Sequence, residues 1–186
     1  MPSKNQSGAD NEQGSLADIA WLAGLLDGDG WVGIIRAKRS GKDYNRYTAS
    51  LMMTSTSYRN AARTRQVLED MGVNVYEREQ PPWYGPDGSP RKRKWNISLR
   101  GNADTAIVLR KLIPHMTEKR YCAELVVQYV EWRESCPRSH GGRGVGSNAV
   151  GMRETADRFM ELMSADRNRH DPSTTTRLAP SPIAEG

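Results

Sequence analysis

The sequence predicts an α+β domain in which an antiparallel four-stranded sheet is backed by helices. Apolar residues follow helical and strand spacings in the order helix, hairpin, helix, hairpin, helix, helix. The four predicted strands fall into two pairs joined by turns, and strands joined in this way pair antiparallel. A length of 186 residues is enough for one such domain with a hydrophobic core of its own.

The first predicted helix begins at Ser15, whose side chain can cap it, and carries apolar residues at helical spacing up to Leu26. Residues 1–14 are rich in polar residues and predict a disordered tail. The helix is expected to end at the two glycines that flank Asp29.

The remaining elements follow from the same periodicities, with turns expected at 40–43 and 81–88. The predicted strands span residues 31–39, 44–56, 73–78 and 92–99. Further helices are expected after the caps Ser57 and Thr117, from Asn102 to Leu112 and over 152–167. The chain then divides into a core domain at 15–135, a glycine-rich linker at 136–150, a C-terminal helix at 151–170 and a disordered tail at 171–186.

The composition indicates the class of partner. Twenty-seven Lys and Arg against 22 Asp and Glu give a net charge of +5, which favours nucleic acid or another anionic surface. The longest apolar run, residues 19–26, is too short to span a bilayer, and the N-terminal segment has no apolar signal region. We therefore expect an intracellular, cytoplasmic protein with no membrane partner, and 20 Arg against 7 Lys favours a bacterial or archaeal source. Cys122 and Cys136 are too few for a disulfide framework and are expected to be reduced.

Two features of the first helix need an explanation beyond folding. Ala20, Gly24 and Gly28 recur every four residues and form one smooth ridge. Because a glycine within a helix costs about 1 kcal/mol relative to alanine, the ridge predicts close approach of another backbone. Asp29 lies at the C-terminal end of the helix, where the dipole disfavours negative charge. A divalent cation would resolve this conflict, whereas the alternative is that Asp27 and Asp29 are ordinary polar turn residues.

The segment 22–30, with the sequence LAGLLDGDG, resembles the signature of the LAGLIDADG homing endonucleases and differs from that string only at Leu26 and Gly28. The predicted element order over 15–135 also resembles the αββαββα core of this family, to which a C-terminal helix is added here. The resemblance implies a site-specific, intron- or intein-encoded endonuclease whose sheet forms a saddle on double-stranded DNA. It implies a double-strand break with 3′ overhangs in a long, near-palindromic target. One motif per chain implies a homodimer, with an interface formed by Ala20, Trp21, Gly24, Leu25 and Gly28.

The resemblance also implies the site residues. Asp29 corresponds to the acidic residue that binds the catalytic metal, expected to be Mg²⁺, with Mn²⁺ or Ca²⁺ able to occupy the site, and Gly28 is a second metal contact. Asp27 corresponds to a structural carboxylate at the helix end. The segment 112–120 resembles the one that opens the later helix of the family and places a catalytic lysine at Lys119, for which a solvated surface lysine is the alternative. The candidates for organising the attacking water follow the second strand and are Ser55, Thr56, Arg59 and Asn60.

Alternation along the strands separates core positions from DNA-facing positions. In the first strand, the alternation that buries Val32 and Ile34 would also bury Arg36 and Lys38. Buried cations are rare, so we expect either a bulge near Ile35, which we favour, or a strand that leaves the core there. A solvated edge strand is the alternative explanation for such basic runs. The residues expected to contact DNA are Arg36, Lys38, Arg39, Lys42, Arg46, Thr48, Ser50, Met52, Thr54, Lys92, Lys94, Asn96 and Ser98.

Other functions are weighed against the endonuclease. A LAGLIDADG nucleic-acid-binding protein that has lost cleavage, such as an intron maturase or a transcription regulator, is the alternative, and the presence of both Asp29 and Lys119 favours cleavage. A structural basic module would leave the ridge and Asp29 without explanation. The glycines at 141–146 follow no strand and precede no Lys-Ser/Thr pair, and the three histidines lack metal-ligand spacing. No small-molecule cofactor is therefore expected.

Overall fold

The computed structural model describes residues 6–38, 45–136 and 150–169. Within these ranges the chain forms one four-stranded antiparallel sheet, a small separate hairpin and helices, which confirms the predicted α+β class. The strands are β1 (Gly30–Lys38), β2 (Asn45–Ser55), β3 (Tyr76–Gln80), β4 (Trp83–Tyr84), β5 (Pro90–Arg91) and β6 (Lys94–Arg100). The helices are α1 (Gln6–Asp29), α2 (Tyr58–Asp70), α3 (Asn102–Leu112), the short 3₁₀ turn η1 (Ile113–His115), α4 (Arg120–Ser135) and α5 (Val150–Arg169).

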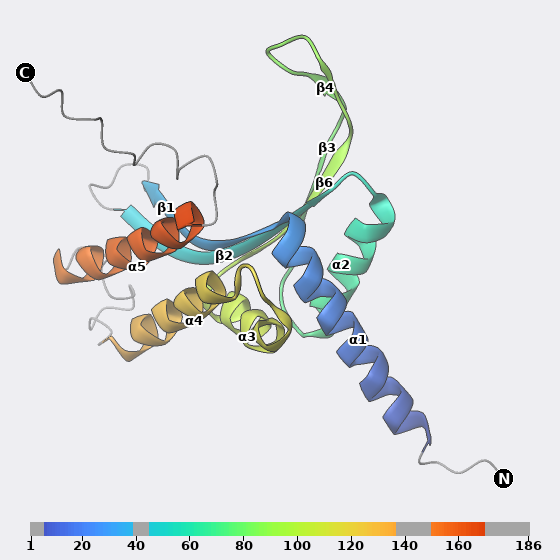
Figure 1. The fold of residues 1–186 in the computed structure, drawn as a ribbon, viewed down its shortest axis with the longest axis horizontal. Helices are drawn as coiled ribbons and strands as arrows, with labels where there is room; N and C mark the ends of the chain where they lie inside the picture. Colours follow the sequence, from blue (N-terminus) through green and yellow to red (C-terminus); the bar gives the residue numbers. More distant parts are fainter. Residues whose placement is uncertain (1–5, 39–44, 137–149, 170–186) are drawn as a thin grey trace, which may run out of the picture.

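The main sheet has the strand order β1-β2-β6-β3, with every neighbouring pair antiparallel. It therefore joins the two predicted hairpins through their inner strands, β2 and β6. In Figure 1, α3 and α4 lie below the bent sheet, while the β4–β5 hairpin rises away from them. Among the described helices, none has an apolar stretch long enough to cross a membrane.

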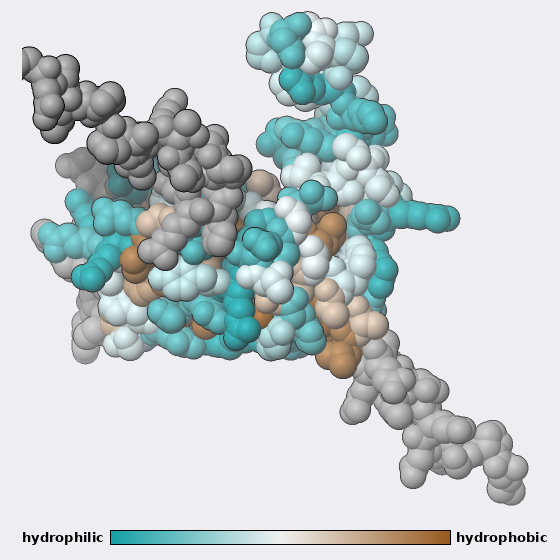
Figure 2. Space-filling view, in the orientation of Figure 1, coloured by the Kyte–Doolittle hydropathy of each residue, from teal (hydrophilic) through white to brown (hydrophobic). Residues whose placement is uncertain are grey.

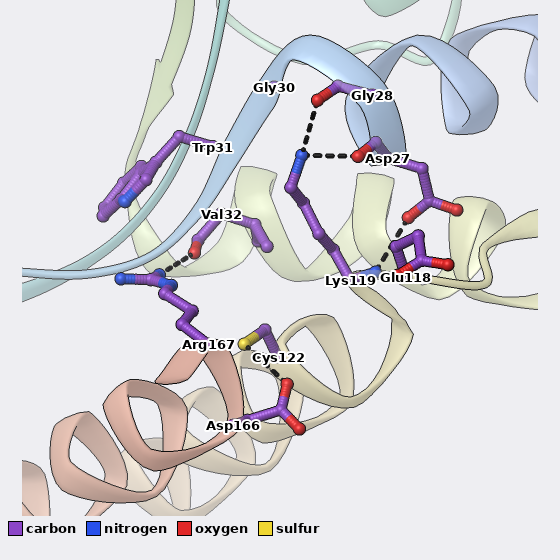
Figure 3. Close-up of a pocket in the computed structure, with 10 residues that line it drawn as sticks. All are labelled: Asp27, Gly28, Gly30, Trp31, Val32, Glu118, Lys119, Cys122, Asp166 and Arg167. Atoms are coloured by element: carbon purple, nitrogen blue, oxygen red, sulfur yellow. Dashed lines mark hydrogen bonds between the residues drawn. The ribbon is translucent and has the colours of Figure 1, made fainter. Parts of the chain in front are cut away.

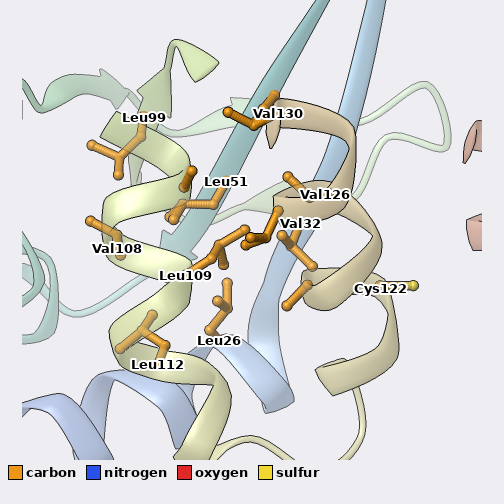
Figure 4. Packing of buried hydrophobic residues seen from close by; sticks show 14 of the residues in the cluster. Leu26, Val32, Leu51, Leu99, Val108, Leu109, Leu112, Cys122, Val126 and Val130 are labelled. Atoms are coloured by element: carbon orange, nitrogen blue, oxygen red, sulfur yellow. The ribbon is translucent and has the colours of Figure 1, made fainter. Parts of the chain in front are cut away.

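The core lies between the sheet and the helices that cover it. Leu51 of β2 pairs with Val32 of β1 on one side and Leu99 of β6 on the other, and all three are buried. Figure 4 shows these side chains meeting Leu109 of α3 and Val126 of α4. Burying such a row of branched side chains fixes the register, because a slip of one residue would turn every one of them to the opposite face.

The N-terminal helix is longer than the sequence predicted. It begins at Gln6, so the predicted tail at 1–14 and the predicted cap at Ser15 are wrong from Gln6 onward. Residues 6–14 contain no proline, and their polar composition does not prevent the helix from extending backwards from its apolar part. The predicted end of the helix at the glycines around Asp29 is confirmed.

The first strand contains no bulge. Its register with β2 runs without interruption from Gly30 opposite Met53 to Lys38 opposite Asn45, so the favoured bulge near Ile35 is wrong. The alternative is correct, because the strand is buried up to Ile34 and exposed from Ile35 onward. Arg36 follows Val32 by four residues in an uninterrupted strand, so its side chain points to the same face, which is the helix side of the sheet. There its guanidinium is 3.5 Å from the Asp157 carboxylate of α5, which contradicts the expected contact with DNA.

The two strands of the second hairpin begin later in the chain than predicted, and both are one residue shorter. β3 begins at Tyr76 instead of residue 73, since Gly72 has a φ of +78° and the Asn74 N–H donates to the Asp104 carboxylate, which holds the preceding residues in a connection. β6 begins at Lys94 instead of residue 92, so Lys92 lies outside the main sheet. The predicted turn at 81–88 is replaced by the separate hairpin of β4 and β5.

The C-terminal helix and the cysteines agree with expectation. In α5, which matches the predicted helix at 151–170 to within one residue at each end, Met163 is buried, and Phe159 and Met160 pack against the core. Cys122 and Cys136 are both free thiols. The predicted linker, apart from Cys136 and Val150, and the predicted tail at 171–186 lie outside the described residues.

Candidate functional site at the junction of α1 and β1

The chain passes from helix to strand at Gly30 without a loop. A methyl group on Gly30 would lie 2.8 Å from both Cα and the carbonyl oxygen of Leu26, so the backbone can fold back this closely only with glycine here. Asp29 is the last residue of α1 and is exposed. It forms no hydrogen bond or ion pair with another described residue. The turn thus presents a bare carboxylate beside the first pair of the β1–β2 ladder.

Asp27 has a different role from its neighbour. Its carboxylate accepts hydrogen bonds from the Thr117 backbone N–H at 2.6 Å, the Thr117 hydroxyl at 3.1 Å and the Lys119 backbone N–H at 3.0 Å. Burial by itself would raise the pKa of Asp27, but these hydrogen bonds outweigh it and lower the pKa below its ordinary value of 3.8. Asp27 is therefore the structural carboxylate that joins α1 to the start of α4.

The same contacts correct the predicted cap of α4. Thr117 donates to Asp27 instead of capping the helix, and α4 begins at Arg120 with Lys119 at the N-cap position and no side-chain cap. The reason is the distant carboxylate, which satisfies the N–H groups of Thr117 and Lys119 in place of a local cap.

Lys119 reaches in the opposite direction, to the end of α1. Figure 3 shows its ammonium group next to the carbonyls of Asp27 and Gly28. Nζ donates to the carbonyl oxygens of Leu26 at 2.9 Å, Asp27 at 2.5 Å and Gly28 at 3.1 Å. These are carbonyls of the last helical turn, which have no partner within the helix, so a lysine here both satisfies them and offsets the negative end of the dipole.

The environment of Lys119 is only partly polar. Burial lowers the pKa of its ammonium group, and the nearby carboxylates of Asp27 and Asp29 oppose this shift without cancelling it. The side chain is therefore neither the solvated surface lysine that was the alternative nor a free cation.

A pocket of about 570 Å³ opens beside this junction, and residues of α5 form part of its lining. Arg167 of α5 donates to the Val32 carbonyl at the edge of the sheet, at 2.7 Å, and its guanidinium lies 5.7 Å from the centre of the Trp31 ring. A methyl group on Gly33 would meet the Trp31 ring at 2.9 Å and the Arg167 guanidinium at 3.1 Å, so glycine makes room for both. The sequence did not predict that Arg167 and Trp31 lie together at this junction, because their proximity depends on how α5 packs.

The fit of a divalent ion can be judged from the oxygens available. No group of three or more His, Cys, Asp or Glu among the described residues could hold a metal ion. The Asp29 carboxylate and the Gly28 carbonyl do form an exposed pair of hard oxygens, although the carbonyl already accepts from Lys119. Mg²⁺ commonly uses one or two carboxylates together with water and substrate phosphates, and this sparse donor set fits an ion shared with a substrate.

The candidates for organising water lie at the same end of the sheet. The register that pairs Gly30 with Met53 brings the end of β2, at Ser55, next to the start of β1. The Ser55 hydroxyl is already engaged, since it accepts from the Ser57 N–H at 3.0 Å and donates to the Ser57 carbonyl. Thr56, Arg59 and Asn60 are exposed.

The small-residue ridge of α1 is open. Ala20, Gly24 and Gly28 are exposed, and a methyl group on either glycine would meet no other atom within 4 Å. The two larger residues expected at the dimer interface are partly used inside the chain. Leu25 packs against the core, and the Arg63 guanidinium lies 4.1 Å above the Trp21 ring.

Comparisons with known proteins complete the description. No protein-family model matches the sequence, and no curated protein matches it. Solved structures do match. The homing endonuclease I-CvuI in complex with the I-CreI target, in the presence of 2 mM Mg, has a TM-score of 0.62 at 18% identity, over 82% of this chain and 83% of that one. The fold is that of the LAGLIDADG homing endonucleases.

Two further LAGLIDADG-fold structures have the same arrangement. The archaeal intron-encoded I-Vdi141I complexed with DNA has a TM-score of 0.57 at 9% identity, covering 81% of this chain and 84% of that one. The LAGLIDADG homing endonuclease I-GzeII in complex with its DNA target has a TM-score of 0.50 at 12% identity and covers 90% of this chain and 50% of that one. The predicted αββαββα core is thereby confirmed as a fold.

The strand register and the burial show which of the expected DNA-facing residues of the LAGLIDADG sheet could reach a ligand and which could not. Ser50 and Ser98 lie on the open face but are buried, and the Ser50 hydroxyl donates to the Leu99 carbonyl at 2.6 Å, so these short side chains do not reach a ligand. Thr54 donates to the Asn96 side chain across the strands at 2.7 Å. The expected residues that share this face and retain accessible surface are Arg46, Thr48, Met52, Thr54, Lys94 and Asn96.

Two of the remaining expected DNA-facing residues, Lys38 and Lys92, do not lie where the prediction placed them, and the open face contains further residues. Lys38 has the parity of Arg36 and lies on the helix side, while Arg39 and Lys42 lie outside the described residues. Lys92 is exposed in the connection before β6. The open face also includes residues that were not among the expected DNA contacts, namely Tyr76, Arg78 and Gln80 of β3 and Arg100 of β6.

Asp27→Asn should lower the free energy of unfolding by about 1–2 kcal/mol at pH 7, because it replaces charge-assisted hydrogen bonds to two backbone N–H groups. The folded-state pKa is depressed, so the wild-type advantage is complete above the ordinary pKa of 3.8 and is lost as the pH falls through the folded value. Urea unfolding of both proteins between pH 7 and the acid limb measures this. Asp29→Asn is the matched control and should unfold like wild type, and equal losses would contradict the assignment.

Lys119→Met should destabilise the protein by about 1–3 kcal/mol, since three carbonyls of the last turn of α1 lose their donor while the apolar stem is retained. Lys111→Met, at an exposed lysine of α3, is the control and should change the stability by less than about 0.5 kcal/mol. Thermal and urea unfolding compare the two. Indistinguishable midpoints would show that the contacts of Lys119 contribute nothing to the fold.

Proposed function

We propose that this chain is a site-specific DNA endonuclease that binds duplex DNA on the open face of its sheet and cuts it beside Asp29. The observation that carries the proposal is the exposed Asp29 carboxylate, fixed at the end of a LAGLIDADG-type helix and next to a ridge that a second helix can approach. DNA complexes of I-CvuI and I-Vdi141I share the fold and support the proposed substrate class.

The open face supplies the contacts that DNA requires. Arg46, Arg78, Lys94 and Arg100 lie on it by register, and their charge favours the phosphate backbone. Thr48, Thr54 and Asn96 add hydroxyl and amide groups that can bond to base edges. The helices cover the other face, so only one side of the sheet can receive the duplex.

The proposed cofactor is Mg²⁺, and Mn²⁺ or Ca²⁺ would bind the same oxygens. Asp29 and the Gly28 carbonyl would hold it, and the bound ion supplies activation of water and charge stabilisation at the leaving 3′ oxygen. An I-CvuI complex with its target was solved in the presence of 2 mM Ca, which supports a divalent ion in this fold. Ser55, Thr56, Arg59 and Asn60 are proposed to orient the attacking water from the end of β2.

The first contribution of Lys119 to the proposed site is structural. Its three N–H donors are all used on the carbonyls of α1, so it holds the helix end on which Asp29 sits. Direct contact with the scissile phosphate, the role expected for a catalytic lysine, requires it to exchange one of these bonds when DNA arrives. Arg167, in the same pocket, adds a second cation toward the duplex backbone.

The chain is proposed to act as a homodimer. One Asp29 serves one strand, and packing two α1 ridges across a two-fold axis would bring two such carboxylates together. A two-fold protein reads both half-sites with the same residues, so the target should be close to a palindrome of about 20 base pairs. The two cuts are proposed to leave 3′ overhangs.

The alternative is a DNA-binding protein that no longer cuts, such as a maturase or a transcription regulator. One observation favours it, namely that the contacts of Lys119 to α1 give this lysine a structural reason to be present without catalysis. Plasmid nicking with Mg²⁺ and with EDTA separates the two functions.

Asp29→Asn should slow strand cleavage by about 10²-fold or more while binding of the selected duplex stays near the wild-type level, because the carboxylate holds the metal and the sheet holds the DNA. Single-turnover cleavage with Mg²⁺ and a binding titration without cleavage measure the two quantities. Asp70→Asn, at an exposed carboxylate of α2, should retain both. Cleavage by Asp29→Asn at the wild-type rate would remove Asp29 from the mechanism.

Gly24→Val should abolish dimer formation and double-strand cleavage together, since a branched side chain would hold the two helices apart. Within one chain the position is open and valine is a slightly better helix former than glycine, so the fold should survive. Light scattering should give a mass near twice 20.8 kDa for wild type and near 20.8 kDa for the variant. Ala165→Val, at an exposed position of α5, is the control. A Gly24→Val monomer that still makes double-strand breaks would contradict the dimer.

A further inference from the structure

The hairpin of β4 and β5 is an arm separate from the main sheet. It leaves after Gln80 and returns at Lys94, which form the last pair between β3 and β6. Its own register pairs Trp83 with Arg91 and Tyr84 with Pro90. Figures 1 and 2 show it as a narrow projection that rises well clear of the body of the molecule.

The tip of the arm is ordered by its own hydrogen bonds. The Gly88 N–H donates to the Gly85 carbonyl at 2.9 Å across a four-residue turn, and Gly88 has a φ of +73°. Asp87 accepts from the Ser89 N–H and hydroxyl and pairs with Arg91 at 3.3 Å. Such a turn holds its strands in one geometry, so the arm can present side chains in a defined direction.

The arm presents two aromatic residues to solvent. Trp83 is 48% exposed and Tyr84 is 75% exposed, and both lie outside the hydrophobic core cluster. Adjacent strand residues point to opposite faces, so the two rings occupy the two faces of the arm. Two large aromatic side chains that stay this exposed and outside the core point to a partner.

The charge of the arm indicates an anionic partner. Arg91 and Arg93 are balanced by Asp87 and Glu79, whereas Lys92 and Lys94 form no ion pair with any other described residue. Aromatic side chains on one strand of the arm and cationic side chains on the other suit a nucleic acid, where cations contact phosphates and rings pack on sugars and base edges. A protein partner would not require the unpaired lysines.

The register gives the direction of the arm. Ser55 pairs with Trp95 near the start of β6, and Met53 pairs with Gly30 at the start of β1. The arm therefore extends from the end of the sheet at which Asp29 lies, and not from the end where β1 and β2 are joined. In the proposed dimer this end faces the two-fold axis and thus the centre of the target.

We propose that the β4–β5 hairpin is a DNA-contacting arm that places Trp83, Tyr84 and Lys92 against the central base pairs of the target, between the two cleavage positions. This inference rests on the proposed function for its partner and extends it to a surface outside the sheet. It assigns the central part of the site to the arm and the flanking parts to β2, β3 and β6.

The test uses the double variant Trp83→Ala/Tyr84→Ala and a duplex that the wild-type full chain selects from a random library. Binding is measured by fluorescence anisotropy with Ca²⁺, and hydroxyl-radical footprinting maps the protected sugars. The affinity should fall about tenfold or more, with protection lost at the central base pairs and kept in both flanks. A second variant, in which Asn-Gly joins Gln80 directly to Lys94 as a two-residue turn, should give the same footprint.

The controls separate the arm from general effects. Ile107→Ala/Leu162→Ala removes two exposed apolar side chains from α3 and α5 on the helix side and should leave affinity and footprint unchanged. Wild-type affinity with a complete footprint in the arm variants would overturn the inference. A footprint lost at the outer ends would overturn it as well, and so would loss of the DNA-free dimer by light scattering, because the arm would then contact the partner protomer.

Failure of the proposed function is distinguishable from failure of the arm. A wild-type chain that selects a duplex and is footprinted on it but never cuts it would remove the endonuclease and leave the arm tested in full. A wild-type chain that selects no duplex would overturn both.

Discussion

The exchange of hydrogen bonds between the end of α1 and the start of α4 is the constraint on which the candidate site depends. Asp27 sends its carboxylate to the N–H groups of Thr117 and Lys119, and Lys119 returns its ammonium group to the carbonyls of α1. Each helix end thereby supplies the partner that the other lacks. The two ends lie about ninety residues apart in the chain, and this joint fixes their relative position.

The joint also explains how a carboxylate can sit where the helix dipole opposes it. Lys119 offsets the negative end of α1, which leaves Asp29 exposed and unpaired among the described residues while the backbone around it is held. Burial lowers the pKa of the lysine, so this compensation has an energetic cost. The backbone around Asp29 is held in place by hydrogen bonds, while the Asp29 side chain itself remains exposed. A functional group on a helix or strand needs this combination.

The sheet organises the rest of the molecule around this joint. Its helix side is closed by the core of α3 and α4, and its edge strand β1 is covered in part by Arg167 of α5. The open side begins at Asp29 and continues along β2 and β6, and the β4–β5 arm leaves from the same end. The proposed catalytic residue and the proposed DNA contacts thus lie on one continuous face that starts at the end of α1.

Local patterns in the sequence determined the fold class, the order of the elements, the helix end at Asp29 and the outward positions of β2 and β6, because these depend on periodicity, glycine placement and strand alternation. They also singled out Asp27 and Asp29 within one short motif. Only the tertiary structure decided what the side chains do. The absence of a bulge in β1 follows from its pairing with β2, the capping role of Lys119 follows from a contact across ninety residues, and Arg167 joins the pocket only because α5 packs beside β1. Such contacts depend on the distances between elements, which periodicity along a single chain does not contain.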